Sequence, residues 1–152
     1  MHRKLTMAGL ALVFGAGWAL NASAQVKPET LVDQRIAAMR LQGKYLFPLV
    51  PMAQGKVPYD AAIVARNAGY LDVLIRLAWD GFDPGTQGVK SRTLPEAYTE
   101  AAKFKAAQET MFAETNKFVA AAKSGNEANT KAAINDMVKA CNGCHDTFRQ
   151  RQ

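Results

Sequence analysis

The sequence predicts an all-α protein that folds as an antiparallel four-helix bundle. Alanine is abundant and runs of β-branched residues are missing, which favours helices over strands. Helix-breaking residues gather at three places, residues 48–58, 80–92 and 124–126. They leave four segments long enough to be helices, joined by two short connections and one longer one. That arrangement is typical of an antiparallel bundle.

The first 24 residues have the pattern of a cleaved secretory signal peptide. A basic start is followed by an apolar run from about Met7 to Leu20 and by the small residues at 22–24. The apolar run is too short for a spanning helix, although an uncleaved N-terminal anchor is the alternative. Cleavage after Ala24 leaves 128 of the 152 residues and lowers the formal charge from +6 to +4. We therefore predict an exported single-domain protein, periplasmic in a bacterium.

The first two helical segments carry clear start and stop signals. The first starts at Pro28, a residue suited to the first turn of a helix, and Pro48 and Pro51 should end or kink it. The second begins near Asp60, whose side chain makes it a good N-cap.

The last two segments are marked in the same way. The third starts at Pro95 and Glu96, and Gly125 stands where a helix commonly ends in a left-handed residue. The fourth starts at Asn126. Each of the four segments has a mainly apolar stripe at helical spacing. The stripes are Val32, Ile36, Met39, Gly43 and Leu46; Ile63, Asn67, Tyr70, Leu71, Leu74 and Leu77; Phe104, Ala107, Met111, Glu114, Phe118 and Ala121; and Ile134, Met137, Cys141, Cys144, His145 and Phe148.

The fourth segment contains both cysteines of the chain and the only histidine after the predicted signal peptide. They form Cys141-Asn142-Gly143-Cys144-His145, and C-x-x-C-H is the pattern of covalent haem c attachment. The two thiols add across the two vinyl groups of the porphyrin. Cysteines three apart lie on one side of a helix, and His145, four residues after Cys141, faces the iron of the tethered ring.

Three other interpretations of the cysteines remain open. A disulfide between Cys141 and Cys144 is compatible with an oxidising compartment. A thioredoxin-like redox pair normally stands at the start of a helix after a strand, whereas this pair lies near the end of an all-helical chain. Zinc would need a fourth ligand from a chain in which His145 is the only remaining histidine. We predict one haem c, attached through Cys141 and Cys144.

The place of the motif in the last of four helices resembles the class II c-type cytochromes, the cytochrome c′ family. Most small c-type cytochromes carry the motif near the N-terminus instead. The resemblance covers the whole chain after the signal peptide. It rests on KPE at 27–29, Arg35 one turn before Met39, GKVPYDAA at 55–62, Trp79, Phe82-x-Pro84-Gly85, Ala101-x-Lys103-Phe104 and KACNGCHDTFR at 139–149.

The resemblance implies a left-handed four-helix bundle with haem c between the helices. It also implies that His145 is the fifth iron ligand, that Arg149 lies beside this proximal imidazole and that Arg35 lies near the haem propionates. A solvated surface position is the alternative for both arginines. Related proteins often pair through their first two helices, which implies a homodimer, although Pro48 and Pro51 alter that surface.

The sixth iron position separates two branches of this family. High-spin cytochromes c′ cover it with an apolar side chain that does not bind, whereas a methionine of the first helix binds in the low-spin cytochrome c-556 type. The family register places Met39 at this position. A thioether is a good axial ligand that raises the reduction potential, and Gly43, one turn on, would leave room for the ring. The alternative is that Met39 only packs in the core.

The sequence therefore favours a periplasmic electron carrier with His145 and Met39 as axial ligands and redox proteins as partners. The alternative is a five-coordinate cytochrome c′ that binds NO or CO. A catalytic haem enzyme ranks last, because it would need a distal acid–base pair and no second histidine follows the signal peptide. Nucleic acid is a poor candidate partner because no basic run interleaves with aromatic residues.

Overall fold

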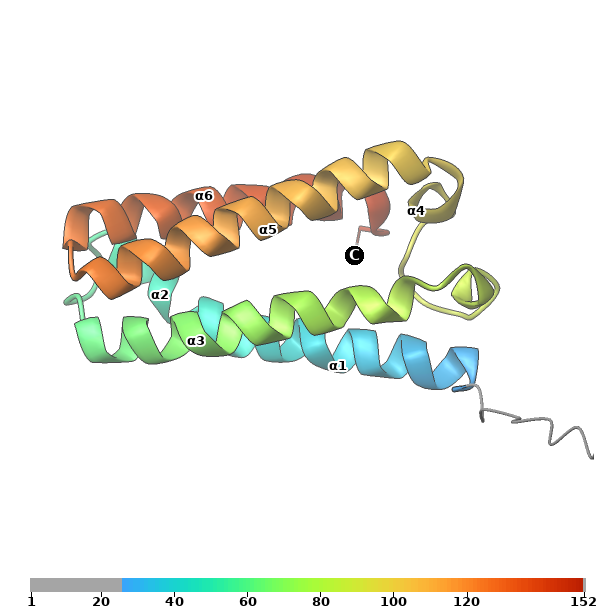
Figure 1. Ribbon diagram of the computed structural model, residues 1–152, viewed down its shortest axis with the longest axis horizontal. Coiled ribbons are helices and arrows are strands. Elements are labelled where there is room, and N and C mark those ends of the chain that lie inside the picture. Colours follow the sequence, from blue (N-terminus) through green and yellow to red (C-terminus); the bar gives the residue numbers. More distant parts are fainter. Residues whose placement is uncertain (1–25, 152) are drawn as a thin grey trace, which may run out of the picture.

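The computed structural model describes residues 26–151 and confirms the predicted all-α, antiparallel four-helix bundle (Figure 1). The predicted signal peptide, residues 1–24, lies outside the described residues. The four long helices are α1 (Pro28–Leu46), α3 (Ala61–Leu77), α5 (Ala101–Ser124) and α6 (Glu127–Phe148). Short elements connect them: α2 (Leu49–Ala53), the 3₁₀ turns η1 (Ala78–Phe82) and η2 (Pro84–Thr86), and α4 (Glu96–Thr99).

Local sequence signals account for most of the helix ends. α1 ends before Pro48, which cannot donate a backbone hydrogen bond, and α2 begins directly after it. The Asp60 carboxylate accepts the backbone N–H of Ile63 at 2.9 Å, as expected of an N-cap. Gly125 adopts a φ of 71° after α5, and the Asn126 side chain then caps α6.

The third segment is the one place where the helix ends differ from prediction. Helix begins at Glu96 as expected, but Glu100 leaves the helical region and separates the single turn of α4 from α5. Contacts with the end of α6 account for the break. The N–H of Leu94 bonds to the carbonyl of Phe148 at 2.9 Å, and Ala97 is buried, so α4 is held against α6 rather than along the axis of α5.

The predicted inner stripe of α3 is partly wrong. Tyr70 and Leu77 are 46 % and 53 % exposed, and Val73 between them is exposed as well. The buried residues are Val64, Asn67, Ala68, Leu71 and Ile75. The reason is that α3 carries apolar side chains on two sides, so its periodicity alone does not tell which side faces the core.

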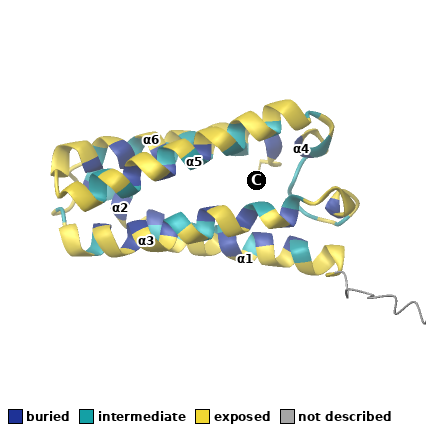
Figure 2. Cartoon of the chain, in the orientation of Figure 1, coloured by how far each residue is buried: buried dark blue, intermediate teal, exposed yellow. Residues whose placement is uncertain are grey.

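The main hydrophobic core lies toward the end of the bundle that holds α2 (Figure 2). Its members are Leu46, Leu49, Met52, Val64, Ala68, Leu71, Ile75, Met111, Phe118, Ala133, Ile134 and Met137. α1 packs against α3, α3 against α5, and α5 against α6, whereas α1 and α6 make almost no direct backbone contact. None of the described helices is long and apolar enough to cross a membrane.

Candidate haem-attachment site

The two cysteines and the histidine of the C-x-x-C-H motif lie in the last two turns of α6. Cys141, Cys144 and His145 are all half-buried, and both thiols are free. The Sγ atom of Cys141 lies 3.6 Å from the Sδ atom of Met111 on α5. The predicted gathering of the motif on one helix face is therefore present, with its apolar side turned toward the bundle.

The ionisation of the two thiols argues against a thioredoxin-like pair. Burial, with a smaller contribution from Cys144, raises the pKa of Cys141 to about 11, and burial also raises the pKa of Cys144. An attacking thiol in a redox pair instead has a lowered pKa, usually at a helix N-terminus. These thiols stand near a C-terminus, where the helix dipole disfavours a thiolate. The residues described contain no cluster of three or more zinc-type ligands.

His145 is held in the state that a metal ligand requires. Burial lowers its pKa, the nearby Arg149 lowers it further, and Arg92 adds in the same direction against the opposing charge of Asp146. The imidazole is therefore neutral at neutral pH and keeps a nitrogen lone pair for a metal. Arg149 is close enough for its charge to act on the imidazole, yet its side chain is exposed.

Met39 lies on α1, on the stripe that includes the buried residues Val32 and Leu46. Met39 itself is only half-buried, as is Ile36 one turn earlier. α1 and α6 make almost no direct backbone contact. The middle of the α1 stripe, at Ile36 and Met39, is therefore less buried by neighbouring residues than its two ends. A Cβ added to Gly43 would lie 3.0 Å from the ring of Phe47, and the room for a haem expected there stays a prediction.

Arg35 is the most unusual buried residue of the protein. It is 2 % exposed, so the solvated alternative is wrong for it. Its Nη1 atom donates to the carbonyl of Gly81 at 2.6 Å and to the Tyr98 hydroxyl at 3.2 Å. Its guanidinium also lies 4.3 Å from the centre of the Phe82 ring. A Cβ on Gly81 would lie 2.5 Å from the Cβ of Arg35, so only glycine fits there.

The charge of Arg35 has no carboxylate partner among the described residues. A buried cation surrounded only by neutral groups costs several kcal/mol of stability, roughly, unless an anion pairs with it. The propionates of a haem are carboxylates and would supply that anion. The buried Arg35 therefore fits a haem held between α1 and α6, as do the half-buried thiols, His145 and Met39.

An aromatic cluster, whose members are scattered in the sequence and share no pattern there, lies at the same end of the bundle as Arg35. It joins η1 to α5 and to the end of α6, with ring centres 4.8 to 6.0 Å apart in its contacting pairs. Its members are Trp79, Phe82, Phe104, Phe112 and Phe148. Such a cluster supplies the apolar, water-poor surroundings in which haem is held.

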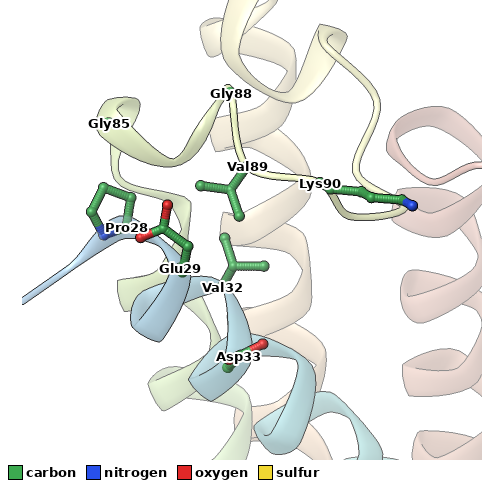
Figure 3. Close-up of a pocket in the computed structure, with 8 residues that line it drawn as sticks. All are labelled: Pro28, Glu29, Val32, Asp33, Gly85, Gly88, Val89 and Lys90. Atoms are coloured by element: carbon green, nitrogen blue, oxygen red, sulfur yellow. The ribbon is translucent and has the colours of Figure 1, made fainter.

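Two surface hollows lie outside this interior. One is formed by the start of α1 and residues 85–90, where Val32 and Val89 face each other (Figure 3). It contains no cysteine, histidine or methionine and is therefore not the haem position. The other runs between α5 and α6 and includes Cys144, Gly143 and Ala140, so the second attachment point reaches the protein surface.

A family model and individual known proteins that resemble this chain point to the same family. The family model described as Cytochrome C′ matches residues 30–149. The cytochrome c′ of Alcaligenes xylosoxydans xylosoxydans is 36 % identical, over 83 % of this chain and 98 % of its own. The cytochrome c-556 of Rhodopseudomonas palustris is 31 % identical, over 100 % of this chain and 99 % of its own.

Solved structures agree with these relatives. The crystal structure of cytochrome c′ from Rubrivivax gelatinosus matches with a TM-score of 0.78 and 37 % identity, covering 82 % of this chain and 98 % of that one. A nitric oxide complex of a variant of cytochrome c prime from Alcaligenes xylosoxidans matches with a TM-score of 0.78 and 34 % identity, covering 84 % and 98 %. The chain therefore belongs to the cytochrome c′ family of class II c-type cytochromes and binds haem c covalently through Cys141 and Cys144.

Proposed function

We propose that the protein holds haem c with His145 as one axial ligand and takes up nitric oxide or carbon monoxide at the opposite face. The comparisons favour this role over the electron carrier predicted from the sequence. Several of the similar solved structures are described as nitric oxide complexes of cytochrome c prime from Alcaligenes xylosoxidans, at 33–34 % identity to this chain. The observation that carries the proposal is the apolar inner stripe of α1, where Ile36 and Met39 are only half-buried.

Each residue of the site has a definite task in this proposal. The haem, when bound, supplies the iron at which a diatomic gas binds. Cys141 and Cys144 fix the ring to α6, and His145 offers a neutral imidazole. Arg35 pairs with a propionate, and the aromatic cluster keeps water away from the ring edge. Ile36 and Met39 cover the gas-binding face without offering an acid or base.

A second candidate is an electron carrier with His145 and Met39 as axial ligands. Met39 is the residue of the α1 stripe with a donor atom for iron, since Val32, Ile36 and Leu46 have none. The cytochrome c-556 relative, aligned over the whole chain, favours this candidate. The hollow beside Cys144 would then bring the ring edge close to a redox partner at the surface.

Absorption spectra of the purified holoprotein, oxidised and reduced, with and without CO, test the two candidates. We expect a high-spin ferrous spectrum that changes when CO is added, because no strong sixth ligand holds the iron. A low-spin spectrum in both oxidation states, with the weak far-red ferric band of methionine ligation and no response to CO, would support the electron carrier instead.

We also propose that the protein is exported to the periplasm and cleaved after Ala24. The proposal rests on the basic, apolar and small-residue order of residues 1–24. The intact mass of the exported protein should then equal residues 25–152 plus one haem, allowing for cyclisation of Gln25. A mass that includes the first 24 residues would contradict it.

Replacing Arg35 by leucine should destabilise the holoprotein strongly. The change removes the cation that pairs with a propionate and leaves that carboxylate buried, at a cost of about 3–5 kcal/mol. Denaturant unfolding of the haem-loaded proteins measures the loss. Arg40→Leu is the matched control, because it makes the same change of charge at an exposed position of α1 and should cost less than about 0.5 kcal/mol. Equal effects of the two variants would contradict a propionate partner.

The exposed apolar side chains of α1 and α3 support a homodimer through these helices. Tyr70 and Val73 of α3 are exposed, and so is Leu41 of α1. Leu41 lies one turn before Tyr45, whose ring centre is 4.7 Å from that of Tyr70, so the three side chains are near one another. An exposed apolar patch of this kind commonly marks a protein interface.

Sedimentation of wild type and variants tests the proposed dimer directly. Wild-type protein should sediment as a dimer, and Val73→Glu should sediment as a monomer because it buries a charge in the interface. Val57→Glu is the control, since Val57 is exposed in the turn before α3 and lies outside the patch. A monomeric wild type, or a dimer that survives Val73→Glu, would contradict the proposal.

A further inference from the structure

The chain does not run free after the end of α6. Arg149 adopts an extended backbone, with φ −129° and ψ 134°, and forms an isolated antiparallel bridge with Thr93. On either side of this bridge the N–H of Leu94 donates to the carbonyl of Phe148 at 2.9 Å, and the N–H of Gln150 donates to the carbonyl of Arg92 at 2.8 Å. We call this pairing of residues 92–94 with residues 148–150 the C-terminal clasp.

Arg92 closes the clasp with its side chain as well as its backbone. Its Nη2 atom donates to the carbonyl of Gln150, the residue whose N–H bonds to the Arg92 carbonyl. This charge-assisted bond lies at the exposed surface, while Arg92 as a whole is half-buried. On the inner side of the clasp, Phe148 is buried and packs edge-on against Phe104.

The clasp acts on the helical turn that contains His145. The last turn of a helix lacks partners for its carbonyls and tends to fray. Here the Phe148 carbonyl is bound by Leu94, and the N–H of Arg149 bonds back to the His145 carbonyl at 3.1 Å. The turn from His145 to Arg149 therefore keeps its own helical bond and is tied to residues 92–94 at its C-terminal end, which limits fraying next to His145.

We propose that Arg92 is a positioning residue of the haem site, which closes the C-terminal clasp and so fixes the directions of His145 and Arg149. The inference rests on the proposed role of His145 as an axial ligand. Opening the clasp frees the last turn of α6, and His145 then takes a wider range of orientations toward the iron. The bond between iron and histidine, and with it the reduction potential, changes without any loss of the thioether links.

Substitutions at position 150 test the clasp without altering any charge. Gln150→Pro removes the N–H that bonds to Arg92, and the extended backbone of Arg149 suits a residue that precedes proline. Gln150→Ala keeps that N–H and the carbonyl, so it is the matched control. Arg92→Leu removes the side-chain bond, and Arg92→Lys restores a cation that can donate to the same carbonyl.

Three measurements on the holoproteins decide the matter: hydrogen exchange of the Leu94 amide, the ferrous iron–histidine stretching frequency and the midpoint potential. Gln150→Pro and Arg92→Leu should speed exchange at Leu94 by roughly tenfold, the effect of losing one to two hydrogen bonds. Both should also shift the stretching frequency and the potential. Gln150→Ala should match wild type in all three measurements, and Arg92→Lys should restore most of the wild-type values.

Two results would overturn the inference. If exchange becomes faster but the stretching frequency and the potential stay unchanged, the clasp is only a structural contact. If exchange also stays unchanged, the clasp does not hold the end of the chain. His145→Gly separates this inference from the proposed function. If that variant keeps the wild-type iron–histidine signature, the proposed ligand itself is wrong. If it loses the signature while the clasp variants keep it, only the clasp inference fails.

Discussion

Cys141→Ser and Cys144→Ser should each leave little mature holoprotein, and the double variant should carry no covalent haem. A serine hydroxyl does not add to a vinyl group under the conditions that join a thiol to it, so each substitution removes one thioether link. Intact mass after acid–acetone extraction measures the covalently bound haem directly. Asn142→Ser is the control, because it introduces serine between the two cysteines at an exposed position and should keep the full haem mass.

The two single variants should differ in stability. Cys141 is the more deeply buried thiol and touches the sulfur of Met111, so Cys141→Ser places a hydroxyl among apolar atoms, at a cost of roughly 1–3 kcal/mol. Cys144 opens into the hollow between α5 and α6, where a hydroxyl can meet water. Haem released from wild type by extraction, or full haem mass in the double variant, would contradict covalent attachment.

The helices and the attachment motif could be predicted because their signals are local. Asp60 and Asn126 cap helices through bonds to residues three positions later, and Gly125 ends α5 by its own backbone conformation. Likewise, a helix alone brings Cys141, Cys144 and His145 to one side. None of these features depends on how distant parts of the chain pack, so spacing in the sequence was sufficient.

The surroundings of the motif could not be predicted because distant segments build them. Arg35 bonds to residues 46 and 63 positions away, from η1 and α4, and nothing near it in the sequence marks it as buried. The C-terminal clasp joins residues 58 positions apart. In α3, apolar residues on two sides make the inner face ambiguous, so the spacing alone predicts the wrong side for Tyr70 and Leu77.

Met39→Ala should raise the rate of CO binding to the ferrous protein by at least roughly tenfold, which corresponds to about 1.4 kcal/mol of barrier. In the proposed function, Met39 covers the gas-binding face of the iron, and a gas molecule must push its side chain aside. Alanine removes most of that side chain. Stopped-flow mixing with CO measures the rate, and unfolding experiments check that the half-buried position tolerates the change.

Met39→Leu distinguishes a steric role of Met39 from ligation, because leucine keeps much of the volume and removes the sulfur. If Met39 acts by its bulk, Met39→Leu should resemble wild type in spin state and in the rate of CO binding. Only Met39→Ala should then bind CO faster. If the sulfur binds iron, wild type should be low-spin and both variants should become high-spin and bind CO. We expect the first pattern. The second would assign His145 and Met39 as the axial pair and make electron transfer the function of the protein.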